Sequence, residues 1–230
     1  MKKSTLFTLL SVFVLIPAAL LLGRTLPGRS HYLVSTLVII FILIPFFLAF
    51  EGRKMQARQL VLIAVLCALA VVSRTAFAWL PHFKPIFGVI IISGIAFGPQ
   101  AGFLVGALSA FASNFLFGQG PWTPWQMLAY GLGGLIAGVC YYRRNWLPKD
   151  SLSLGLFGFV VVLLIVCPLL DTSTVLTSLT VFTPASVIAV YASAILTNLI
   201  QAGCTLLTLL VLSKPLLAKL ERITRKYGLS

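Results

Sequence analysis

The sequence predicts an all-α integral membrane protein, and three observations support that prediction. Of its 230 residues, 60% are hydrophobic and only 9% are charged, whereas a soluble domain has about 25% charged residues. The apolar runs have the length of a bilayer-spanning helix and lack the alternation of a β-barrel strand. The net charge of +13 comes from lysines and arginines that lie between the apolar runs, which indicates membrane orientation and not nucleic-acid binding.

Two spans are predicted in residues 1–50. Residues 1–23 begin with Lys2 and Lys3 and continue as a long apolar run, which is similar to a signal peptide. The run is long for a signal peptide and no Ala-x-Ala cleavage site follows, so we expect a retained helix over about 5–23. A second span is expected over about 32–50.

A basic linker at 51–58 is the predicted internal boundary, and a basic tail occupies 214–230. Between them we expect spans at about 59–81, 86–99, 101–118, 124–142, 152–170 and 185–213. The pair 86–99 and 101–118 is short and hinges at Gly98-Pro99, so we expect it to be tilted or partly re-entrant. The expected architecture is a six-helix core, 59–213, preceded by two extra transmembrane helices.

Basic residues set the expected orientation. With the N-terminus in the cytoplasm, thirteen of the 17 lysines and arginines fall in cytoplasmic segments, and only Arg24, Arg29 and Lys84 fall in outer loops. Eight spans with both termini cytoplasmic satisfy this bias. The outer face of the core then consists of loops at 81–85, 118–123 and 171–183.

The stretch Asn114–Gln126 is the main polar interruption between apolar segments, and two glycines and two prolines within it preclude a continuous helix. Thr123-Pro124 followed by Gln126 predicts an N-cap, a proline at the first helical position and a capping-box partner. A helix should therefore begin at Pro124. Thr183-Pro184 predicts a second helix start of the same kind.

The same stretch offers amide and indole groups to a polar, ring-containing ligand, although a purely structural turn at the membrane interface is the alternative. The candidates are Asn114, Gln119, Trp122, Trp125 and Gln126. Small residues at Gly102, Gly106 and Ala110 recur every four positions and lead to Asn114; Gly134 and Gly138 form a second set. Such stripes allow close helix packing in lipid.

Arg74 is the one charged residue well inside a predicted span, and charges within the membrane are functional candidates. It is a candidate to neutralise an anionic ligand group or Asp171; snorkelling to the interface or bracing the bundle are the alternatives. Asp171 and Lys84 lie at the outer edges of spans. We expect His31 and His82 to be solvated in outer loops.

Several kinds of chemistry are not supported by the sequence. The cysteines Cys67, Cys140, Cys167 and Cys204 lack metal-ligand spacing, so we interpret them as small apolar residues and expect no metal. There is no catalytic motif and no P-loop, and we expect no enzyme activity. With four acidic residues, proton coupling is disfavoured, so any transport should draw its energy from a partner.

Two adjacent stretches, AFGPQAGFLVGALSAFASNF (96–115) and GQGPWTPWQM (118–127), resemble the substrate-binding S component of energy-coupling factor (ECF) transporters, the vitamin importers of bacteria. Ala64-x-x-x-Ala68 adds a weaker match, and the resemblance covers 59–213. It implies six helices that bind a vitamin under their outer loops in the bacterial cell membrane, with no covalently bound cofactor. The implied partners are a transmembrane T subunit and two cytoplasmic ATPases.

Carried onto this sequence, the resemblance makes Ala64 and Ala68 the surface that docks on the T subunit, against which the S component topples to deliver its ligand. The implied ligand-site residues are Asn114, Gln119, Trp122, Trp125, Gln126 and Tyr130, with Arg74, Asp171 and Asn198 as weaker candidates. The helices at 5–23 and 32–50 depart from the six-helix pattern.

The segment 122–127 is similar to cobalamin-type S components, so cobalamin or a related corrinoid is the expected ligand. Riboflavin and a queuosine precursor are the alternatives. Two other function classes stay open at this point. A self-sufficient secondary transporter is disfavoured by the shortage of carboxylates within the membrane, and a non-transport scaffold would use the small-residue stripes only for assembly.

Overall fold

The computed structural model describes residues 57–142, 148, 150–179 and 181–227, together with residues 37 and 40. These ranges contain only helices and their connections. The elements are α4 (Ala57–Ala76), α5 (Ile86–Phe97), α6 (Pro99–Phe117), α7 (Thr123–Tyr141), α8 (Ser151–Val161), the π-helix η2 (Val162–Val166), α9 (Cys167–Ser178) and α10 (Pro184–Tyr227). The predicted helices at 5–23 and 32–50 lie outside the described residues, apart from positions 37 and 40.

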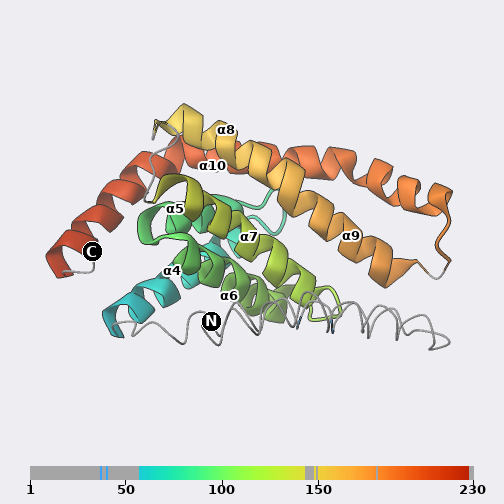
Figure 1. The fold of residues 1–230 in the computed structure, drawn as a ribbon, viewed down its shortest axis with the longest axis horizontal. Helices are drawn as coiled ribbons and strands as arrows, with labels where there is room; N and C mark the ends of the chain where they lie inside the picture. Colours follow the sequence, from blue (N-terminus) through green and yellow to red (C-terminus); the bar gives the residue numbers. More distant parts are fainter. Residues whose placement is uncertain are drawn as a thin grey trace, which may run out of the picture.

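The described helices form a bundle in which α5 and α7 lie between two outer groups. Figure 1 shows α8, α9 and α10 along one side and α4 and α6 along the other. The connections α4–α5, α6–α7 and α9–α10 lie toward one end of the bundle, which we call the loop end. The α5–α6 turn, the start of α8 and the C-terminal part of α10 lie toward the opposite end.

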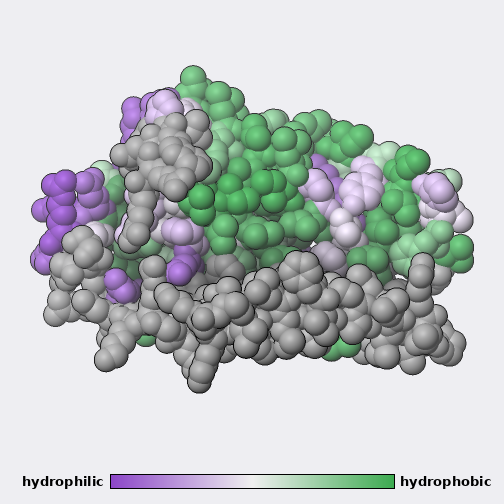
Figure 2. All heavy atoms as spheres, viewed as in Figure 1, coloured by the Kyte–Doolittle hydropathy of each residue, from purple (hydrophilic) through white to green (hydrophobic). Residues whose placement is uncertain are grey.

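The surface is typical of a protein that spans a membrane. Four described segments are long and apolar enough to cross a bilayer: Gln59–Ala76, Pro99–Phe117, Ser151–Ser178 and Pro184–Lys226. Figure 2 shows hydrophobic side chains over the middle of the molecule and hydrophilic ones gathered toward the end that holds the C-terminal part of α10. These features confirm the predicted all-α membrane class.

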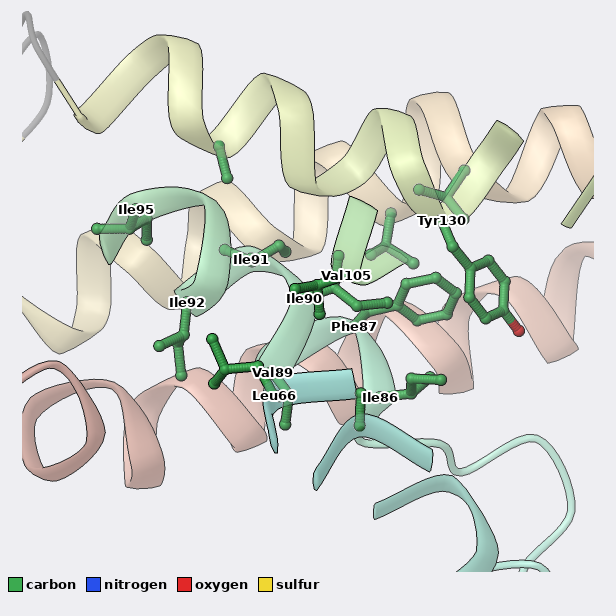
Figure 3. Close-up of a cluster of buried hydrophobic side chains, with 14 of the residues drawn as sticks. Leu66, Ile86, Phe87, Val89, Ile90, Ile91, Ile92, Ile95, Val105 and Tyr130 are labelled. Atoms are coloured by element: carbon green, nitrogen blue, oxygen red, sulfur yellow. The ribbon is translucent and has the colours of Figure 1, made fainter. Parts of the chain in front are cut away.

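Helix α5 is the centre of the core. Its 12 residues are apolar all round, and those from Ile86 to Ile95 are all buried, as expected of a helix enclosed by others. Leu66 of α4 and Val105 of α6 belong to the same buried cluster as its isoleucines, and Figure 3 shows both beside α5. The rings of Phe87 and Tyr130 meet edge to face with centroids 4.5 Å apart.

Glycines allow α6 and α7 to pack with their backbones in contact. A Cβ atom added to Gly102 would lie 2.7 Å from the carbonyl carbon of Gly134, and one added to Gly106 would lie 2.5 Å from the carbonyl carbon of Tyr130. No side chain fits at either position. The stripe that the sequence predicts on α6 is therefore a helix-packing face.

The break between α5 and α6 occurs where the sequence predicts it. Gly98 has a φ of 93°, which favours glycine, and Pro99 begins α6. The predicted spans at 86–99, 101–118 and 124–142 agree with α5, α6 and α7 to within two residues. Helix α4 is shorter than the predicted span at 59–81, because it ends at Ala76.

The predicted outer loop at 171–183 is wrong over most of its length, because the helix that begins at Ser151 continues to Ser178. Three threonines in the helical part of this segment, Thr172, Thr174 and Thr177, donate hydrogen bonds to carbonyls of their own helix. Thr172 donates to Pro168 O at 2.7 Å and Thr177 to Ser173 O at 2.7 Å. A polar run that satisfies its hydroxyls within the helix need not leave it, so Asp171 lies inside a helix.

Helix α10 is longer than the predicted span at 185–213, and the basic tail is helical as far as Tyr227. Pro215 lies inside this helix, and a proline in such a position bends a helix without necessarily ending it. Figure 1 shows α10 bent toward its C-terminal end. Leu216, Leu217 and Leu220 pack against the core, which holds the basic segment to the bundle.

The two predicted helix starts differ in outcome. At α10 the N-cap is confirmed: Ser186 N donates to Thr183 Oγ1 at 3.1 Å, and Thr183 N donates to Ser186 Oγ at 3.0 Å. At α7 the predicted capping box is wrong, because Thr123 is already helical and Trp122 precedes it without a side-chain cap. The side chains of Thr123 and Gln126 make other hydrogen bonds.

Candidate functional site

Asn114 is the centre of a buried polar network at the loop end. It lies in the last turn of α6 and is only 1% exposed. Its Nδ2 donates to Thr123 Oγ1 at 3.0 Å and to Gln126 Oε1 at 2.8 Å. Both acceptors belong to the first turn of α7. The network explains why Thr123 and Gln126 do not form a capping box.

Arg74 joins this network from α4. Its Nη1 donates to Ser113 Oγ and, at 3.1 Å, to Asn114 Oδ1. Its guanidinium carbon lies 4.5 Å from the ring centroid of Phe117 and 6.0 Å from that of Tyr130, within cation–π range. The side chain is 4% exposed, so Arg74 does not snorkel and it ties α4 to α6.

The side chain of Gln119 extends the network into the α6–α7 loop. Thr123 Oγ1 donates to Gln119 Oε1 at 2.9 Å and accepts from Gly120 N at 3.2 Å. Gln119 Nε2 donates to Phe111 O at 3.0 Å. Gln119 is exposed and Gln126 is half-buried, so these two amides lie at the accessible edge of the network.

The two tryptophans of the loop have different environments. Trp122 is 41% exposed, whereas Trp125 is 7% exposed and packs with Phe103 and Leu128 in a separate apolar cluster. Trp125 is therefore part of the packing of α7. Because both residues are tryptophans near the start of one helix, the sequence alone does not tell which of them is buried.

Tyr130 lies between the apolar core and the network. Its ring contacts Phe87, and Figure 3 shows its hydroxyl pointing away from the cluster of buried side chains. The guanidinium of Arg74 approaches the same ring. Of the predicted ligand-site residues, Arg74, Asn114, Gln119, Gln126 and Tyr130 therefore occupy one connected region.

Asp171 and Asn198 form a second polar pair, between α9 and α10. Asn198 Nδ2 donates to Asp171 Oδ2 at 2.7 Å, and Asp171 is 8% exposed. Arg74 does not pair with Asp171, because among the described residues the one salt bridge joins Arg225 and Glu221. The two polar regions are not joined by a described hydrogen bond.

Sequence reasoning missed several polar residues of these regions. Ser113 accepts from Arg74, and Tyr191 and Thr172 share a hydrogen bond of 2.8 Å between α9 and α10. Gln201 is 9% exposed and lies three residues after Asn198, which places both on one face of α10. That spacing is the signal that could have identified Gln201 from the sequence.

Lys84 is a second cation near the network. It lies in the α4–α5 connection and is half-buried. Burial lowers the pKa of Lys84 below its ordinary value, and the positive charge of Arg74 lowers it further. The two basic side chains are therefore close enough to repel each other.

The described residues include no group of three histidine, cysteine or acidic side chains that could hold a metal ion. All four cysteines are free, and two of them, Cys167 and Cys204, are buried. Ala64 and Ala68 are exposed on one side of α4. They lie beside Val61, Val65 and Val72, which are also exposed, so α4 presents a continuous apolar surface with small residues along it.

The fold and the network define a polytopic membrane protein with a candidate solute site at one end of its helix bundle. A family model described as "ECF-type riboflavin transporter, S component" matches residues 54–219. The chain belongs to this family. Proteins of the family are substrate-binding membrane subunits of ECF transporters without an ATPase of their own, and the family implies a T subunit and ATPases as partners.

The chain is also similar to curated proteins called UPF0397. It is 30% identical over 114 residues to the Vibrio atlanticus protein, covering 47% of this chain and 62% of the relative. It is 29% identical over 109 residues to an Aliivibrio salmonicida protein (45% and 57%), and 37% identical over 73 residues to a Lactococcus lactis protein (31% and 36%). The chain thus spans less than two thirds of these relatives. No solved structure matches.

Proposed function

We propose that this chain captures a micronutrient at the loop end and delivers it through an ECF module of one T subunit and two cytoplasmic ATPases. The observation that supports the proposal is the buried network of Arg74, Asn114 and Gln126. Buried polar groups in a membrane are costly, and the family to which the chain belongs binds substrates.

The expected orientation supports capture from outside the cell. The basic residues Lys214, Lys219 and Arg222 belong to the part of α10 that lies opposite the loop end. Under the positive-inside rule this opposite end faces the cytoplasm and the loop end faces outward. Both termini are then cytoplasmic in the bacterial cell membrane.

Two ligands have specific support. The similarity of residues 122–127 to cobalamin-type S components favours a corrinoid, and the description of the matching family names riboflavin. A queuosine precursor is a third member of the panel to be tested. Trp122, which is exposed at the loop end, offers a stacking surface that suits the rings of each.

Delivery requires a docking surface, and we propose that Ala64 and Ala68 provide it. Both side chains are exposed on α4. Small side chains allow a partner helix to approach closely in lipid. In this proposal the S component topples against the T subunit at this face.

The test is a binding titration of the purified full chain in detergent against cobalamin, riboflavin and a queuosine precursor. We expect saturable binding of one of them, which raises the melting temperature with ligand concentration. Liposomes that contain the chain alone should show no sustained uptake. Absence of binding to every vitamin of a broad panel, or uptake without the ATPases, would contradict the proposal.

A further inference from the structure

Arg74 is a buried cation for which the described residues supply no carboxylate. The sequence has four acidic residues. Asp150 accepts from Ser153 N, Asp171 accepts from Asn198 and Glu221 pairs with Arg225. The fourth, Glu51, lies outside the described residues. A charge buried without an opposite charge is unfavourable, and the described residues offer Arg74 only neutral acceptors and the rings of Phe117 and Tyr130.

One edge of the Arg74 guanidinium is unused. Both described hydrogen bonds leave through Nη1, toward Ser113 and Asn114. Its Nε is buried and has no hydrogen-bond partner within the described residues, and no described hydrogen bond leaves Nη2. The Nε and Nη2 protons point in parallel along one edge, which is the geometry that binds a carboxylate or phosphate through two oxygens.

Lys84 brings a second positive charge to the same region. It is near enough to Arg74 for the two charges to interact, and it makes no salt bridge within the described residues. Two cations of a chain with few acidic groups are thus brought together, which costs free energy in the absence of an anion. An oxyanion bound at the open guanidinium edge would offset the repulsion between the two positive charges.

We propose that the ligand of this site has an anionic oxygen group, a carboxylate or a phosphate, that binds the Nε–Nη2 edge of Arg74 with Lys84 as the second cation. The inference rests on the proposed function, and it narrows the substrate to a class that neither the family description nor the resemblance to S components specifies. Ser113 and Asn114 act as positioning residues, because they fix the guanidinium through Nη1.

The experiment compares solutes that differ mainly in one anionic group. The probes are biotin and biotinamide, nicotinate and nicotinamide, and pantothenate and pantothenol for the carboxylate, and flavin mononucleotide and riboflavin for the phosphate. Binding to the full chain in detergent is measured by calorimetry. In at least one pair we expect the anionic member to bind about 10- to 100-fold more tightly, as a charge-assisted contact requires.

Variants test which residues recognise the anion. Lys84→Gln changes a side chain in the α4–α5 connection, outside the helices, and should reduce the preference for the anionic member by about 3- to 10-fold. Lys219→Gln removes an exposed cation at the opposite end and should change nothing. Arg74→Lys keeps the charge without the two-proton edge, so it should reduce the preference while retaining weak anion binding.

The outcomes separate this inference from the proposed function. Equal or tighter binding of the neutral member in every pair that binds, or a preference that Lys84→Gln and Arg74→Lys leave unchanged, would overturn the inference while the importer function stands. Absence of binding by all members of the vitamin panel would contradict both. If Arg74→Lys does not fold, the comparison of anionic and neutral solutes and the Lys84→Gln variant still test the inference.

Discussion

Asn114 and Gln126 hold the end of α6 against the start of α7 through a hydrogen bond of 2.8 Å between Nδ2 and Oε1. The two residues are separated by a loop that carries Gly118, Gly120 and Pro121, and their hydrogen bond adds to the backbone contact between the two helices. Because Asn114 also accepts from Arg74, one amide fixes three helices at the loop end.

We expect Asn114→Leu to lower the free energy of unfolding by about 2–4 kcal/mol, because it removes one hydrogen-bond partner each from Arg74, Thr123 and Gln126 in a largely buried setting. Thermal unfolding of the purified protein in detergent measures the change. As a control, Ser193→Ala removes an exposed hydroxyl of α10 that bonds only Val190 O, and it should unfold like the wild type. Equal stability of the Asn114→Leu protein would show that the network is unimportant for folding.

Asn114→Asp should have a different effect, because it provides Arg74 with an internal carboxylate. We expect folding to be retained and the binding of anionic solutes to fall at least about 10-fold, since the new charge competes for the guanidinium and repels an oxyanion. Calorimetry with the anionic and neutral pairs measures it. Unchanged anion binding by this variant would contradict the role of Arg74.

Gly134→Ala should destabilise the bundle, because the added Cβ would lie 2.5 Å from the carbonyl carbon of Gly102. Backbone atoms cannot yield as a side chain can, so we expect a loss of about 3 kcal/mol. Gly203→Ala is the matched control in α10, where nothing lies within 4 Å of the new atom. That variant should be unchanged or up to about 1 kcal/mol more stable through helix propensity.

Ala64→Arg and Ala68→Arg should abolish co-purification with the T subunit and uptake, while ligand binding is retained. A long charged side chain prevents close helix approach at the α4 surface. Ala192→Arg tests the same chemistry at an exposed alanine of α10 and should leave the complex intact. If all three variants assemble normally, the docking surface lies elsewhere.

The stability of the unliganded protein relative to its Lys84→Gln variant should increase as the pH rises toward 10.5, the ordinary pKa of lysine. Burial and Arg74 lower the pKa of Lys84 in the folded state, so between its folded and unfolded pKa values the unfolded chain binds the additional proton. The contribution of Lys84 to the free energy of unfolding therefore increases as the pH rises through that window. The gain is lost when the pH falls through the folded pKa. Melting temperatures of Lys84→Gln should lack this rise; an identical pH profile would contradict it.

Much of the fold follows from the sequence because hydropathy and helix-breaking residues are local properties. The turn at Gly98-Pro99 and the N-cap at Thr183 were predictable from adjacent residues. The length of the span predicted at about 152–170 was not predictable, because Thr172 and Thr177 satisfy their hydroxyls inside the helix. Residue type alone cannot distinguish that arrangement from a polar loop.

The candidate site was predictable in composition and not in its contacts. Asn114, Gln119 and Gln126 were identified as a group, but the link to Arg74 joins residues 40 positions apart, which no local pattern encodes. Trp125 has the same residue type as Trp122 and yet is buried in another cluster. The direction of each side chain within the bundle determines both the contact of Arg74 with Asn114 and the burial of Trp125.

The short length of α5 limits how far the ends of this helix can reach across the bilayer. Twelve residues of helix extend about 18 Å, whereas the hydrocarbon layer is about 30 Å thick. At least one end of α5 must therefore lie within the hydrocarbon layer, either at the Phe77–Pro85 connection or at the Gly98 turn. Where it is the connection, a solute bound beside Lys84 is already partly withdrawn from water before any partner protein moves.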